Sequence, residues 1–96
     1  MNAASITFKK SNYTNGGLEY TAIVETREVA NGIAAQFPKS CRVWATTYSG
    51  SEGVAGIVIF RVLAASTSKG MGEINEAGAA RLKSFLRHAA KIGVVA

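Results

Sequence analysis

The sequence predicts an α+β fold in two layers, a four-stranded, mostly antiparallel sheet with two helices on one face. Four segments, in two pairs, predict strands: three alternate apolar and polar residues, as half-buried strands do, and the fourth is apolar on both faces. Each pair precedes a segment whose apolar residues recur every three to four positions, as on one side of a helix. The element order is therefore ββαββα. The chain of 96 residues has the length of one domain, residues 1–96.

Residues 6–10 and 18–25 predict a β-hairpin, because an Asn-Gly pair at 15–16 lies between them and both residue types tolerate positive φ. The hairpin carries two positive charges and an aromatic ring, those of Lys9, Lys10 and Tyr13. Such a tip can stack on bases or insert into a protein groove. Lysines on an edge strand also prevent aggregation between sheets, so the same residues fit a purely structural role.

The first helix is predicted over residues 27–37, with Thr26 as its N-cap and Pro38 beyond its end. Residues 41–48 predict the third strand, on which Arg42, Trp44 and Tyr48 share one face. If that face is exposed, it forms an aromatic and basic patch of the kind that anchors interfaces. Residues 54–63 are apolar on both faces, which predicts a central strand or a strand covered by a helix or a second subunit.

Residues 64–72 predict a flexible polar loop, and residues 75–92 the long second helix, with Asn75 as N-cap and Gly93 as terminator. The loop places Lys69, Gly70 and Gly72 before a helix N-terminus, where backbone N–H groups favour an anion. The order of residues is not that of a P-loop, and an ordinary connection from strand to helix explains them equally well.

The second helix predicts a basic outer face. Lys83, Arg87 and Lys91 follow each other at four-residue spacing opposite the apolar stripe, and Arg81 lies at its border. No acidic residue follows Glu76 to balance them. The row is either a contact surface for an anionic partner or the solvated side of an amphipathic helix.

Composition restricts the function classes. Eleven Lys and Arg residues against six Glu residues, with no Asp, give a net charge of +5, which favours acidic proteins, nucleoprotein complexes, DNA or RNA as partners. The single cysteine, Cys41, indicates a reducing compartment, and we expect the cytoplasm. No signal peptide and no apolar stretch long enough to span a bilayer are present, so we expect no membrane partner.

The sequence contains few side chains that could form a catalytic site. Cys41 and His88 are the only thiol and the only imidazole, and a nucleophile would require them to meet and to be oriented by a third group. One His and one Cys do not complete the usual zinc ligand sets. We therefore expect no catalytic residues, no metal and no cofactor, and we expect the chain not to be an enzyme.

Three functional hypotheses follow. The first is a small binding protein that engages a larger macromolecular complex with an acidic surface and regulates or inhibits it by steric or electrostatic blocking. Phage-encoded inhibitors of host defence, anti-CRISPR proteins among them, share this size and architecture. This is an analogy of size class, and no sequence motif supports it. The second is a basic nucleic-acid-binding protein, which we expect to be a dimer and whose affinity for DNA or RNA should fall as the salt concentration rises. The third is a self-assembling structural protein.

Overall fold

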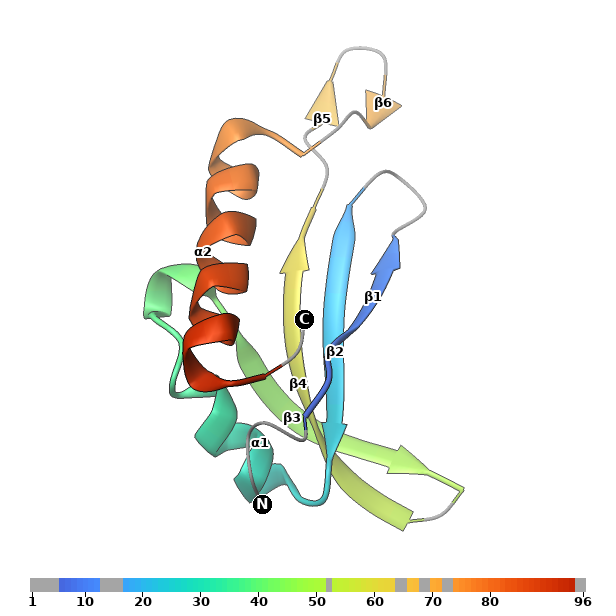
Figure 1. Ribbon diagram of the computed structural model, residues 1–96. Coiled ribbons are helices and arrows are strands. Elements are labelled where there is room, and N and C mark those ends of the chain that lie inside the picture. Colours follow the sequence, from blue (N-terminus) through green and yellow to red (C-terminus); the bar gives the residue numbers. More distant parts are fainter. Residues whose placement is uncertain are drawn as a thin grey trace.

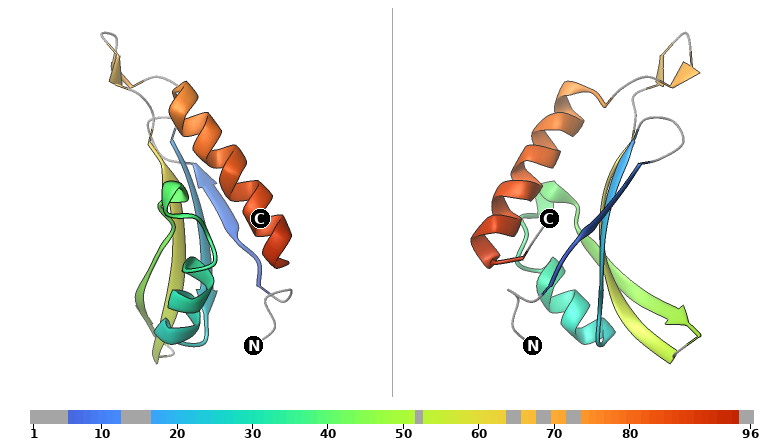
Figure 2. Two further views of the ribbon diagram at one scale, coloured as in Figure 1. Left: turned by 90° about the vertical axis from the view of Figure 1, so that its left-hand side faces the viewer. Right: turned by 45° about the vertical axis from the view of Figure 1, so that its right-hand side comes forward.

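The computed structural model describes residues 6–12, 17–51, 53–63, 66–67, 70–71 and 74–94. It confirms the predicted α+β fold and the order ββαββα (Figure 1). The main sheet has four antiparallel strands in the order β1-β2-β4-β3, and both helices lie on the same side of it (Figure 2). The bounds of its strands are Lys9–Asn12 for β1, Leu18–Val24 for β2, Trp44–Gly50 for β3 and Gly53–Val62 for β4.

Strand β4 is central, as its two-sided apolar sequence predicts. It pairs with β2 on one edge and β3 on the other, with Val58 opposite both Ala22 and Ala45. The even-numbered residues Gly56, Val58, Phe60 and Val62 face the helices and are buried. The odd-numbered residues of β4 face the opposite side, which neither of the two described helices covers (Figure 2).

Both helices begin at the predicted caps. Helix α1, Arg27–Ala34, starts where the Thr26 hydroxyl accepts a hydrogen bond from the backbone N–H of Val29. Helix α2, Glu76–Ile92, starts at Asn75, whose side chain accepts from the N–H of Gly78, and ends at Gly93 in the left-handed conformation. Helix α1 ends three residues before the predicted bound, because residues 35–37 tighten into turns, although Phe37 stays buried.

Two predicted segments are corrected. The third strand does not begin at Cys41, because residues Lys39–Cys41 form a short 3₁₀ helix, η2, and the strand starts at Trp44. Arg42 closes η2 with a left-handed backbone, φ 57° and ψ 38°, so it does not belong to a strand face. The segment predicted as an irregular loop contains a two-stranded ladder, β5 (Ser66–Thr67) with β6 (Gly70–Met71), which projects beyond the main sheet in Figure 1.

The core between the sheet and the helices is built around Phe85 of α2. Its ring stacks on Phe60 at a centroid distance of 4.1 Å and on Phe37 at 5.2 Å. The rings of Phe8 and Tyr20 complete the cluster at 5.2 Å and 5.3 Å. This cluster holds α2 against β4 along the half of the helix that bears the predicted basic residues.

Candidate functional site

An open pocket of about 590 Å³ lies where η2, the end of β4 and the first half of α2 meet. Its polar lining comes from two arginines, two serines and an asparagine, and its apolar lining from the end of β4 and three small residues of α2. The lining residues are Ser40, Arg42, Val62, Leu63, Asn75, Ala77, Gly78, Ala80, Arg81 and Ser84. None of them carries a carboxylate, so the pocket is positively charged. We call it the arginine pocket.

Helix α2 approaches β4 closely at the pocket floor because Gly78 has no side chain. A Cβ atom at this position would lie 2.7 Å from Cγ1 of Val62. The close approach lets the first turns of α2 form one wall of the pocket while Val62 forms another. The N-cap side chain of Asn75, which also lines the pocket, accepts a hydrogen bond from the N–H of Gly78 at 2.8 Å.

The Arg81 side chain is fixed in the pocket wall. Its Nη1 donates a hydrogen bond to the carbonyl oxygen of Cys41 at 3.2 Å, and its guanidinium lies 5.3 Å from the centre of the Phe60 ring. Burial lowers the pKa of Arg81, and the positive charge of Arg42 lowers this pKa further. Both arginines line the same pocket, so their positive charges disfavour each other.

Arg42 is the second cation of the pocket, and its backbone is unusual. Among the described residues it is the one non-glycine residue with positive φ. A left-handed backbone costs a residue with a side chain on the order of 1 kcal/mol relative to glycine. The backbone N–H of Arg42 donates to the carbonyl oxygen of Lys39 at 3.0 Å, whereas its exposed side chain makes no hydrogen bond or ion pair with a described residue. Its guanidinium therefore has no protein counter-charge.

The lone thiol and the lone imidazole lie on either side of Ser84. The Ser84 hydroxyl oxygen is 3.4 Å from Sγ of Cys41 and 3.4 Å from Nδ1 of His88. Nδ1 also lies 2.8 Å from the carbonyl oxygen of Ser84, to which a protonated ring nitrogen donates. In that tautomer Nδ1 cannot accept the serine proton. Cys41 is fully buried, with 0% exposure. Its contact with Ser84 holds η2 against α2.

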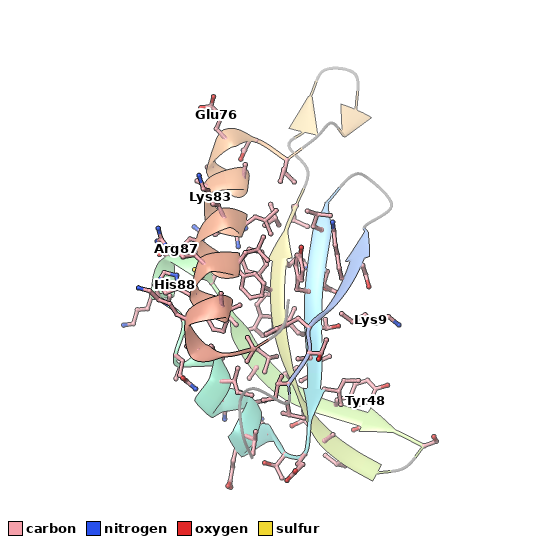
Figure 3. The ribbon with its side chains drawn as sticks, in the orientation of Figure 1. Lys9, Tyr48, Glu76, Lys83, Arg87 and His88 are labelled. Carbon is pink, nitrogen blue, oxygen red and sulfur yellow. The ribbon has the colours of Figure 1, made fainter. Side chains whose placement is uncertain are left out.

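The predicted basic row is exposed on α2. Lys83, Arg87 and Lys91 are all solvent-accessible, and none forms an ion pair with a described residue. Figure 3 shows Lys83 and Arg87 pointing away from the sheet. Arg81 belongs to the arginine pocket at the border of this row. We call Lys83, Arg87 and Lys91 the α2 row.

The uncovered face of the sheet is a second candidate surface. It exposes Trp44 by 39%, Tyr48 by 41% and Ile23 by 58%. The prediction that Trp44 and Tyr48 share a face is confirmed by their register against Ile59 and Ala55, but Arg42 is not their neighbour.

Arg61 of β4 takes the place that the sequence assigned to Arg42. Its guanidinium lies 5.4 Å from the Trp44 ring centre and pairs with Glu19 at 2.7 Å. Lys9 of β1 lies on the same face (Figure 3), because it is paired with Thr21. Lys10 is paired with Tyr20, so it lies on the opposite face. The two lysines that the sequence groups together are therefore divided between two faces.

Several predicted residues lie outside the part of the chain that the structure describes. Tyr13 at the hairpin tip and Lys69 and Gly72 of the predicted anion loop belong to this group. Gly70 is part of β6, where it pairs with Thr67. Among the described residues, no group of three or more His, Cys, Asp or Glu side chains could hold a metal ion. No helix of the described segments has both the length and the apolar character needed to cross a membrane.

Comparison with protein-family models, curated proteins and solved structures finds no significant match. The function is therefore inferred from the surfaces of the molecule. The sequence identified Arg42 and Arg81 but placed them in different groups, because 39 positions separate them and the packing of η2 against α2 brings them to one pocket.

Proposed function

We propose that the chain is a non-catalytic binding protein that docks on an acidic surface of a larger protein or nucleoprotein complex. By covering that surface it regulates or inhibits the complex. The observation that carries this proposal is the α2 row, three exposed cations on one helix, none of which forms an ion pair with a described residue. A helix with three aligned positive charges complements a negative surface and increases the rate of encounter with it.

The rigidity of the α2 row supports this proposal. The row lies on a helix of 17 residues that is capped at both ends. On its other side, Phe85 is held by the aromatic cluster. Cations on such a helix keep their spacing, so little conformational entropy is lost when they bind a complementary surface. Cations near a helix C-terminus also complement the helix dipole, so the proposal requires a direct binding test.

The test compares two variants of equal charge change. The first replaces Lys83, Arg87 and Lys91 with Glu, and the second replaces Lys9, Lys10 and Arg27 with Glu. Fluorescence anisotropy measures the binding of each to labelled poly-L-glutamate, a stand-in for an acidic protein surface. We expect the first variant to lose at least tenfold more affinity than the second. Equal losses would mean that net charge alone drives binding and would refute the proposal.

Nucleic-acid binding is the second candidate, and it is favoured by the uncovered sheet face. Trp44 and Tyr48 are four residues apart on one strand, which separates them by about 13 Å along β3. Exposed rings at this spacing can stack on bases of a single strand, with Lys9 near a phosphate. This candidate predicts that single-stranded DNA binds in a salt-dependent manner and that Trp44→Ala weakens it more than reversal of the α2 row does. Wild-type affinity in Trp44→Ala would remove it.

A further inference from the structure

The arginine pocket contains two positive charges that the described protein does not neutralise. Arg81 is held in place by the Cys41 carbonyl and the Phe60 ring, so it cannot swing away from Arg42 without losing both contacts. Burial of Arg81 also removes part of the water that would screen the repulsion. The free protein therefore bears an electrostatic cost that an anion bound in the arginine pocket would reduce.

Arg42 adds a second, independent cost, because its backbone is left-handed. Glycine would adopt this conformation with less strain, and an uncharged residue would avoid the repulsion on Arg81. Strained residues of this kind concentrate at sites where their side chain has a function. The left-handed backbone at Arg42 ends η2 and places this residue in the lining of the pocket, beside Arg81, rather than on a strand.

From this arrangement we infer that the arginine pocket binds the phosphate monoester group of a small organic molecule. A monoester carries close to two negative charges at neutral pH and offers three acceptor oxygens. These match the charges and the paired N–H donors of two guanidinium groups. A carboxylate would neutralise only one of the two cations. This site uses residues other than the α2 row, so it is a function beyond the docking proposed above.

The rest of the lining agrees with a phosphorylated organic ligand rather than a bare ion. Ser40 and Ser84 line the pocket together with the arginines, and serine hydroxyl groups can donate to phosphate oxygens. When the Cys41 thiol donates to Ser84, the serine proton is free for the ligand. The volume of about 590 Å³ exceeds what a phosphate group fills, and the apolar wall formed by Val62 and Leu63 suits an organic substituent.

The test is a titration of the full ¹⁵N-labelled chain at pH 7.5 with ethyl phosphate, a monoester, and with diethyl phosphate, the singly charged diester. We expect saturable shifts of the backbone amides of residues 40–42 and 78–84 with ethyl phosphate, and at least tenfold weaker binding of diethyl phosphate. Arg42→Gln should weaken ethyl phosphate at least tenfold. Lys83→Gln, which removes the same charge from the outer face of α2, should change the affinity less than twofold.

Three results would overturn the inference: shifts that do not saturate, equal binding of monoester and diester, or equal losses in Arg42→Gln and Lys83→Gln. Arg42→Gly is the control for loss of binding through misfolding, because it removes the guanidinium group and also relieves the backbone strain. It must also lose ethyl phosphate while retaining the wild-type amide spectrum away from the pocket. The result is independent of the poly-L-glutamate experiment, whose charge-reversal variants leave Arg42 and Arg81 in place.

Discussion

Replacing Phe85 with Ala should remove a large part of the stability of the fold. Four rings surround Phe85, at centroid distances of 4.1 Å for Phe60, 5.2 Å for Phe8 and Phe37, and 5.3 Å for Tyr20. Truncating a buried Phe to Ala costs about 3–5 kcal/mol. Because rings from four different segments of the chain would border the cavity, the site cannot collapse through the movement of one side chain. We therefore expect a loss of about 4–5 kcal/mol in the free energy of unfolding.

Urea denaturation followed by circular dichroism measures this loss, with Leu86→Ala as the matched control. Leu86 is the next residue of α2 and is 36% exposed, so its truncation should cost about 1 kcal/mol or less. A domain of this length has a total stability of roughly 5–14 kcal/mol, so the difference between the two variants is measurable. A loss below about 2 kcal/mol for Phe85→Ala, or equal losses in both variants, would refute the central position of Phe85.

Three further changes test the elements that shape the arginine pocket and the sheet. Asn75→Ala removes the cap of α2 and should lower the free energy of unfolding by about 1 kcal/mol, whereas Asn75→Ser should restore most of it in the same urea experiment. Gly56→Ala should destabilise the fold strongly, because the added Cβ would clash with the Thr26 carbonyl oxygen; a wild-type melting temperature would contradict this close approach. Arg42→Gly should leave stability unchanged or raise it by up to about 1 kcal/mol, and a clear loss would show that the left-handed backbone is not strained.

Local patterns in the sequence were sufficient to predict the layers and the order of the elements. Alternation in β2 and the apolar character of β4 identified the sheet, because a strand buried on one side repeats every two residues. Thr26, Asn75 and Gly93 marked the helix ends, because their capping interactions involve residues a few positions away. Such features depend on neighbours in the chain.

The candidate site could not be assembled in the same way. Arg42 lies in a stretch that alternates like a strand, and nothing in the sequence shows that the chain turns there through a left-handed residue. Its approach to Arg81 depends on how η2 docks on α2, through Cys41 and Ser84, which is a tertiary contact. For the same reason Arg42 was predicted to share a strand face with Trp44, although the arginine that lies over the Trp44 ring is Arg61 of β4.

A residue-level map of poly-L-glutamate binding on the ¹⁵N-labelled wild-type chain tests most directly whether the helical side of the molecule is its docking surface. The proposal predicts that the perturbed amides concentrate on α2 between Lys83 and Lys91 and that the perturbation weakens as salt rises. Perturbations spread evenly over the chain, or centred on Trp44 and Tyr48 of β3, would contradict it.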